Sequence, residues 1–184
     1  MNITFVTGNQ RKLGEAKQAC KDFDIEVEQK QLEIDEIQNH DPIKISIHKA
    51  NTAFKLLKRP IVVNDSSWTI PALNNFPGGY MKDIAEWFTS KDFINLMKDK
   101  ADKRIGCIET VIYRDKDLTK IFHKEFWGEI ATKPKGKSGN SIERVAIFNG
   151  KTLAEFHDEG RFAYESKDYI WHDFAKWYAK KINK

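Results

Sequence analysis

The chain has 184 residues, of which 40% are hydrophobic and 32% are charged, and its formal net charge is +4. These values favour one domain over residues 1–184 and an anionic ligand, but basic and acidic residues alternate along most of the chain, which argues against a nucleic-acid partner. No apolar run approaches the roughly 20 residues that span a bilayer, and the chain enters a strand pattern without a signal peptide, so we expect a cytoplasmic protein with no membrane partner.

The first half of the chain predicts strands and helices in alternation. Apolar residues recur at spacings of three and four after Asn9, and Asp41-Pro42 is a typical helix start. The expected elements are a strand over 3–6, a helix capped by Asn9, a strand over 25–28, a helix from Pro42 that Arg59-Pro60 ends, and a strand over 61–63 that ends at the polar residues 64–67. This order is typical of an α/β fold.

The second half predicts more β structure. A β-like stretch over 107–130, interrupted at 115–117, predicts a hairpin, and Asn149-Gly150 predicts a second hairpin turn. The expected elements are a loop over 71–80, helical residues 84–97 with a break and new cap at Ser90, the first hairpin, a basic loop over 132–140, strands 145–148 and 153–156, and a final helix capped by Ser166.

A possible phosphate site lies between the first strand and the first helix. The turn contains Gly8, and a glycine turn before a helix offers free backbone N–H groups and the positive end of the helix dipole. Lys12 adds a charge within the first helical turn, and Thr7 and Asn9 add side-chain donors. An ordinary turn with a solvated lysine is an equal alternative, and the spacing is not that of a Walker loop.

Two acidic segments are candidates for a metal site. Residues 32–38 contain three carboxylates, and Asp65 follows the strand over 61–63, where a doubly wound fold opens its ligand crevice. Magnesium prefers carboxylate oxygens and retains several waters, so one acid from each segment would suit it. The alternatives are a solvated acidic face for 32–38 and a cap for Asp65. On the second predicted helix, Lys49 is placed to meet a phosphate, and His48 is more typical of an incidental surface histidine.

These segments occur in the order of a known enzyme family. The chain resembles the inosine triphosphate pyrophosphatase (XTP/dITP diphosphatase) family in five motifs. They are the opening strand and phosphate turn at 5–12, the glutamate segment at 33–38, the lysine-bearing helix at 45–50, the acidic strand end at 62–67 and the Ala-Leu…Pro-Gly loop at 72–80.

The resemblance implies a central elongated mixed β-sheet with flanking helices, and two lobes around a nucleotide cleft. It implies magnesium-assisted hydrolysis of a nucleoside triphosphate between its α- and β-phosphates, which yields a nucleoside monophosphate and pyrophosphate. It also implies a homodimer.

Carried onto this chain, the resemblance gives each site residue a role. Glu36 and Asp65 hold Mg²⁺, and Asp65 also orients or deprotonates the attacking water. Lys12 and Lys49 neutralise the triphosphate, a division of labour that suits phosphoryl transfer. The remaining substrate-binding residues are Thr7, Gly8, Asn9 and Ser66.

The second half departs from the family pattern. The base-recognition stretch, expected near 139–148, keeps little of its motif, and Arg161 stands where a Ser-His-Arg motif is expected. Asn64 occupies a position that is usually acidic in the family. We therefore predict action on deaminated purine nucleotides (ITP, dITP, XTP) with altered or relaxed base selection. The alternatives are a non-catalytic or differently specific nucleotide-binding relative and a different hydrolase on the same scaffold.

Overall fold

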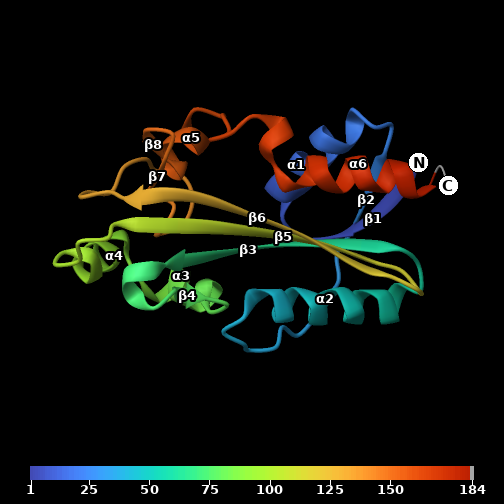
Figure 1. Cartoon of the computed structure of the whole chain (residues 1–184), viewed down its shortest axis with the longest axis horizontal. Helices are drawn as coiled ribbons and strands as arrows, with labels where there is room; N and C mark the ends of the chain where they lie inside the picture. Colours follow the sequence, from blue (N-terminus) through green and yellow to red (C-terminus); the bar gives the residue numbers. More distant parts are fainter. Residues whose placement is uncertain (183–184) are drawn as a thin grey trace. The chain divides into compact units, whose positions relative to one another are not determined.

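The computed structural model describes residues 1–182, which form a mixed α/β fold with eight strands and six α-helices (Figure 1). The strand order is β2-β1-β3-β5-β6-β7-β8, and β4 pairs with β3. The sheet is mixed because β1 runs parallel to β2 and β3, whereas β4, β7 and β8 pair antiparallel. The predicted α/β fold with a central mixed sheet and flanking helices is therefore confirmed.

The chain divides into two compact units. The first consists of Met1–Ser66, Glu109–Lys124 and Ser166–Lys184, described to residue 182, and the second of Ser67–Ile108 and Glu125–Glu165. The nucleotide cleft expected between two lobes stays a prediction, as does the assignment of residues 1–184 to one functional domain.

The first unit contains the N-terminal elements and the last helix. Its elements are β1 (Asn2–Val6), α1 (Gln10–Lys21), β2 (Glu26–Lys30), α2 (Pro42–Leu57), the beginning of β3 (Ile61–Ile70), the end of β5 (Arg104–Arg114), the beginning of β6 (Thr119–Ile130), the short 3₁₀ turn Ser166–Asp168 and α6 (Ile170–Ile182). In this unit α2 covers one face of the strands, and α1 and α6 cover the other (Figure 1).

Two cores follow from the alternation of side chains along the strands. Val62 and Val111 pack under α1 and α6, in a cluster that contains Phe5 and the buried Trp171. The intervening positions of the same strands form the core under α2, and they are Val6, Ile61, Val63 and Ile112. Because β3 is buried on both faces here, a polar side chain on either face lies in a sheltered environment.

Both helices that lead to the candidate site residues begin as predicted. The Asn9 side chain accepts a hydrogen bond from the backbone N of Lys12, which satisfies one free donor of the α1 N-terminus. The Asp41 side chain does the same for Ile43, and Pro42 occupies the first turn of α2.

The second unit has a core of its own, which includes Trp68, Phe93, Ile105 and Phe148. Its remaining elements are the 3₁₀ turn Pro71–Leu73, β4 (Phe76–Gly78), α3 (Met81–Trp87), α4 (Ser90–Met97), β7 (Ala146–Phe148), β8 (Lys151–Thr152) and α5 (Leu153–Asp158). The hairpin at Asn149-Gly150 is confirmed: β7 and β8 pair antiparallel, and both turn residues have positive φ.

Three predicted boundaries are wrong. Residues 153–156 are helical, because Thr152 and Glu155 form a capping box that starts α5. The cap of α4 is Thr89, one residue before the predicted Ser90, and it forms a capping box with Asp92. The last helix begins at Ile170, and Ser166 instead opens the preceding 3₁₀ turn.

The third strand is longer than predicted and runs through residues 64–67 to Ile70. The polar residues 64–67 have the composition of a turn, but Ser67 to Ile70 are all buried in the strand. Asp65 therefore lies within a strand and not at its end. Among residues 1–182, no helix is long and apolar enough to cross a membrane.

Candidate active site

The candidate site residues meet where β1 ends beside β3, within the first unit. Phe5 of β1 pairs with Val62 of β3, and β1 stops at Val6 while β3 continues. The segment of β3 that carries Asn64 and Asp65 consequently extends past the end of its neighbour. The strand end that was expected at Asp65 is therefore that of β1 and not that of β3.

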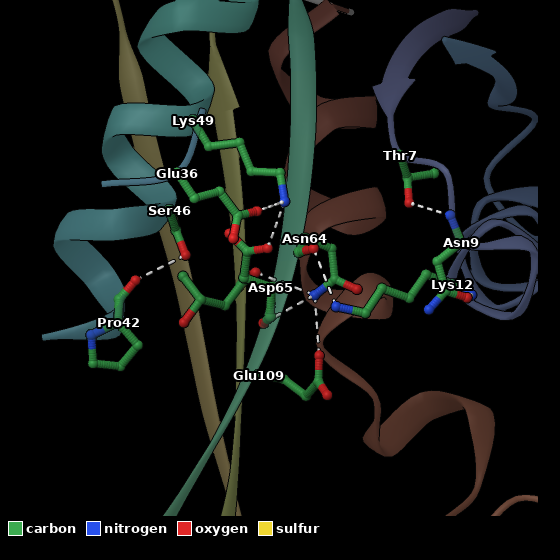
Figure 2. Close-up of polar contacts among 11 residues, drawn as sticks. Thr7, Asn9, Lys12, Glu36, Pro42, Ser46, Lys49, Asn64, Asp65 and Glu109 are labelled. Atoms are coloured by element: carbon green, nitrogen blue, oxygen red, sulfur yellow. Dashed lines mark hydrogen bonds and ion pairs between the residues drawn. The ribbon is translucent and has the colours of Figure 1, made fainter. Parts of the chain in front are cut away.

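An ion-pair cluster joins two acidic segments through Lys49 (Figure 2). The Lys49 ammonium lies 2.9 Å from Glu36 Oε1 and 2.9 Å from Asp65 Oδ1. Glu36 lies on the irregular segment before α2, Lys49 on α2 and Asp65 on β3. The side chain of Asp65 is 24% exposed and that of Glu36 39%, so the cluster reaches from the sheet to solvent.

The charges in this cluster stabilise one another. Burial alone raises the pKa of the Asp65 carboxyl, but the ammonium groups of Lys49 and Lys12 outweigh it, and the pKa lies below its usual value. Burial alone lowers the pKa of Lys49, but Asp65 and Glu36 outweigh it, and the pKa of Lys49 is raised. At neutral pH Asp65 is therefore ionised and Lys49 is protonated.

The turn between β1 and α1 lies close to this segment of β3. The Lys12 ammonium donates to the backbone oxygen of Asn64 at 3.2 Å. Within the turn, the backbone N of Asn9 donates to Thr7 Oγ1 at 3.0 Å. A Cβ atom added to Gly8 would meet nothing within 4 Å, so neither packing nor backbone conformation requires glycine there.

On the other face of β3, Asn64 forms a second polar cluster (Figure 2). Its amide nitrogen donates to Glu109 Oε2 of β5 at 3.0 Å and to the backbone oxygen of Thr110 at 3.1 Å. Glu109 is not among the residues predicted from the sequence. The only signal for it is a single carboxylate inside the otherwise uncharged stretch 105–113.

Some of the predicted residues stay outside these clusters. Ser66 is half-buried on β3, and within residues 1–182 no hydrogen bond joins its side chain to the cluster. Glu33 and Asp35, the other two carboxylates of the acidic segment, are exposed. His48 is half-buried, contrary to the expected surface position, and its Nδ1 is buried without a hydrogen-bond partner.

The carboxylates fit a magnesium ion that takes most of its ligands from elsewhere. The Ser46 hydroxyl lies near the Asp65 carboxylate but donates its hydrogen to the backbone oxygen of Pro42. Asp65 Oδ2 is thus buried without a donor within the described chain, and one oxygen remains for a ligand. No group of three or more His, Cys, Asp or Glu residues suitable for a metal occurs within residues 1–182. Glu36 and Asp65 therefore offer two carboxylates, and the other ligands would come from elsewhere. This arrangement suits Mg²⁺, which binds through one or two carboxylates together with water and substrate phosphates.

Comparison with known proteins assigns the family. The model of the Ham1 family matches residues 3–168. The chain belongs to the Ham1 family. The Ham1 relatives carry names that agree with the resemblance found in the motifs, which is thereby confirmed.

Two curated Ham1 relatives cover most of the chain. The dITP/XTP pyrophosphatase of Methanopyrus kandleri is 29% identical over 185 residues, which cover 99% of this chain and 98% of that protein. Inosine triphosphate pyrophosphatase 2 of Trypanosoma cruzi is 32% identical over 162 residues, which cover 85% of this chain and 82% of that protein. Among solved structures, a HAM1 protein from Coxiella burnetii superposes with a TM-score of 0.83 at 21% identity, covering 98% and 99% of the two chains, and it supports the fold.

Residues 139–148, which depart from the base-recognition motif, lie in the second unit. Hydrogen bonds within that unit hold them in place. The backbone N–H of Asn140 donates to Glu143 Oε2 at 2.8 Å, and the backbone N–H of Glu143 donates to Asn140 Oδ1 at 3.1 Å. The Ser141 backbone oxygen accepts from Ser90, and Arg144 Nε donates to the backbone oxygen of Gly136. The polar side chains and backbone groups that replace the motif in this Ham1 protein thus have bonding partners within their own unit.

Proposed function

We propose that this chain hydrolyses deaminated purine nucleoside triphosphates (ITP, dITP, XTP) to the nucleoside monophosphate and pyrophosphate, with altered or relaxed base selection. Membership of the Ham1 family supports the proposal, and so do relatives named dITP/XTP pyrophosphatase and inosine triphosphate pyrophosphatase. The observation that carries it is the Glu36–Lys49–Asp65 cluster, which joins two carboxylates and a protonated amine at the end of β1.

The cluster supplies the charges that cleavage of a phosphoanhydride requires. Glu36 and Asp65 are the residues that would hold magnesium. A magnesium ion bound by them neutralises phosphate charge and acidifies a coordinated water. Because its pKa is depressed, Asp65 is a weak base at neutral pH, and we assign it the orientation of the attacking water more than its deprotonation.

The two lysines hold the phosphate chain in this proposal. Lys49 is anchored by both carboxylates, and Lys12 lies at the backbone of Asn64, next to Asp65. Thr7, Gly8 and Asn9 offer hydroxyl, backbone and amide donors at the N-terminus of α1, which favours anions. Each charge-assisted contact to phosphate contributes about 1.5–3 kcal/mol.

Identification of the released product tests the proposed reaction. The purified protein is incubated with magnesium and, separately, with ITP, XTP, dITP and the four common ribonucleoside triphosphates, and pyrophosphate and orthophosphate are both measured. We expect pyrophosphate and nucleoside monophosphate in equal amounts. Release of orthophosphate with a nucleoside diphosphate would refute the proposal.

The magnesium site has its own test. We expect Glu36→Gln to raise the magnesium concentration that gives half-maximal activity by roughly tenfold, because one anionic ligand is lost. Glu33→Gln, an exposed acid of the same segment, serves as the control and leaves the magnesium dependence unchanged. Equal magnesium curves for the two variants would remove Glu36 from the site.

The non-catalytic alternative rests on the departures in the second half and on Asn64. It predicts binding of the triphosphates, measured by calorimetry, without release of pyrophosphate. The homodimer and the cytoplasmic location stay predictions from the sequence.

A further inference from the structure

The polar group around Asn64 lies on the opposite face of the sheet from Lys49. Asp65 contacts α2, whereas Asn64 contacts Glu109, whose strand neighbour Val111 packs under α1 and α6. Consecutive residues of a strand point to opposite faces of the sheet, so Asp65 belongs to the Lys49 cluster and Asn64 to the Glu109 cluster. Lys12 approaches the second of them (Figure 2).

The orientation of the Asn64 amide is set by its surroundings. Its nitrogen has two hydrogens and lies within 3.0 Å of Glu109 Oε2, 3.1 Å of Thr110 O and 3.4 Å of Asp65 O. All three are acceptors, and an ionised carboxylate accepts only. A flipped amide would place its oxygen against three acceptors, so the nitrogen must face Glu109.

This orientation leaves the Asn64 amide oxygen as an acceptor without a partner. Asn64 is 4% exposed, and within residues 1–182 its Oδ1 is buried and accepts no hydrogen bond. Leaving a buried acceptor unbonded costs free energy, and such groups in native structures call for an explanation. The Lys12 ammonium donates to the backbone oxygen of Asn64 at 3.2 Å.

We propose that Glu109 is a positioning residue, which acts through Asn64 on Lys12 and so on the binding of the phosphate chain. Glu109 holds the amide nitrogen of Asn64, and the backbone oxygen of the same residue accepts a hydrogen bond from the Lys12 ammonium. Without Glu109 the amide nitrogen loses its one charged acceptor and is held only by the backbone oxygens of Thr110 and Asp65. This inference rests on the proposed triphosphate chemistry for its reaction, but the coupling of Glu109 to Lys12 is measurable by binding alone.

The test is a double-mutant cycle between Glu109 and Lys12, with ITP hydrolysis and the binding of inorganic tripolyphosphate as the two readouts. We expect Glu109→Ala to raise KM and the tripolyphosphate Kd by roughly tenfold with a smaller change in kcat, as expected for a lost contact to a charged group. In the Lys12→Ala background, Glu109→Ala should change neither value further. Glu109→Gln keeps an acceptor for the Asn64 amide and should stay within about threefold of the wild type.

Two controls separate positioning from folding. Glu26→Ala removes an exposed glutamate from β2 of the same unit and should change neither KM nor Kd. Thermal melts identify any variant that fails to fold. Asn64→Ala, which removes the amide that Glu109 holds and keeps the backbone oxygen that Lys12 contacts, then takes the place of Glu109→Ala in the cycle with the same expected values.

The outcomes distinguish this inference from the proposed function. Additive losses of binding in the cycle, or unchanged tripolyphosphate binding in Glu109→Ala, overturn the positioning role. If the variants show coupled losses of tripolyphosphate binding while the wild-type protein releases no pyrophosphate, the positioning role is supported and the proposed reaction is overturned.

Discussion

Asp65 occupies a position where a carboxylate is costly to bury and yet stays ionised. Lys49 lies 2.9 Å from its Oδ1, and together with Lys12 it lowers the pKa of Asp65 despite burial. Its other oxygen is buried without a partner among the described residues. A carboxylate held in one orientation by a lysine, with an oxygen left over, is suited to bind a cation or a water.

The negative charge of Asp65 can be removed without changing the shape of its side chain. Asp65→Asn keeps the shape of the side chain and removes its charge, so we expect kcat for ITP to fall by roughly 100-fold or more. Circular dichroism should show the fold intact, because Lys49 retains Glu36 as a partner. Asp35→Asn, an exposed acid, is the matched control and should keep full activity. Wild-type turnover in Asp65→Asn would exclude Asp65 from the chemistry.

At the level of elements, the turn from β1 into α1 is built as expected, with Asn9 as the cap of the helix. Gly8 lies in this turn without a positive φ and with open space around the position of a Cβ atom. Because the fold itself does not require glycine at this position, the missing side chain leaves space for a ligand to approach the backbone. A phosphate bound at the N-terminus of α1 would use this space.

We therefore expect Gly8→Ala to raise KM for triphosphates by roughly tenfold without lowering the melting temperature, because the methyl group enters the space of the phosphate. Gly14→Ala in α1 is the control. Its Cβ also meets nothing within 4 Å, and it should stabilise the protein by about 0.5–1 kcal/mol and leave KM unchanged. If Gly8→Ala behaves like Gly14→Ala in both measurements, the turn does not hold the substrate.

The turn between β5 and β6 allows a prediction about pH and stability. Burial raises the pKa of Asp115, but hydrogen bonds from the Tyr113 hydroxyl and the Lys181 ammonium outweigh it and lower the pKa to about 2. A carboxyl whose folded pKa is depressed stabilises the protein above its unfolded pKa of about 3.9, and this contribution is lost as the pH falls through the folded value.

At pH 7 we expect Asp115→Asn to lower the free energy of unfolding by about 1–2 kcal/mol, allowing for solvent screening of the turn. The difference from the wild type should shrink between pH 4 and pH 2, as followed by urea denaturation. Asp117→Asn, at an exposed position of the same turn, should change stability by less than about 0.5 kcal/mol. A difference for Asp115→Asn that is constant across this pH range would contradict the assignment.

The elements also show which parts of the fold local sequence can predict. The helix starts at Asn9 and Asp41 were predicted because capping is a short-range interaction. Residues 64–67 have turn composition but form a strand, because β3 lies between β1 and β5, which are distant in sequence, and the residues on either side of this segment are buried. Tertiary packing overrides local propensity there.

Some residues of the candidate site could be predicted from the sequence, and others could not. Glu36 and Asp65 were predicted to act together through magnesium and Lys49 to bind the triphosphate. The structure brings the three side chains into one ion-pair cluster, and their roles stay predictions. Glu109 was not foreseen, because its contact with Asn64 depends on how β5 lies beside β3, across a sequence separation of 45 residues. Strand neighbours of this kind cannot be derived from composition or spacing.

Over the whole chain, the proposed phosphate chemistry and the departures from the family pattern fall in different units. Lys12, Glu36, Lys49 and Asp65 belong to the first unit, and residues 139–148 belong to the second. In the second unit, the side chains of Asn140, Glu143 and Arg144 form hydrogen bonds with the backbone of residues 136–143. A pocket rejects the wrong base strongly only when its polar groups would otherwise lose their partners. Asn140 Oδ1, Glu143 Oε2 and Arg144 Nε already have partners, so these atoms exert little such selection.

The hydrogen bonds of Asn140, Glu143 and Arg144 within their own unit favour relaxed base selection over a new selective pocket. We expect kcat/KM for ITP and XTP to exceed that for ATP, GTP, CTP and UTP by less than about a hundredfold, which is the range a pocket reaches without dedicated polar groups. Asn140→Ala and Arg144→Ala should lower the melting temperature and leave the ratio of ITP to ATP turnover unchanged, because these side chains brace their own loop. A preference above a hundredfold would show that other residues select the base. A ratio altered by Arg144→Ala at an unchanged melting temperature would place that selection in this loop after all.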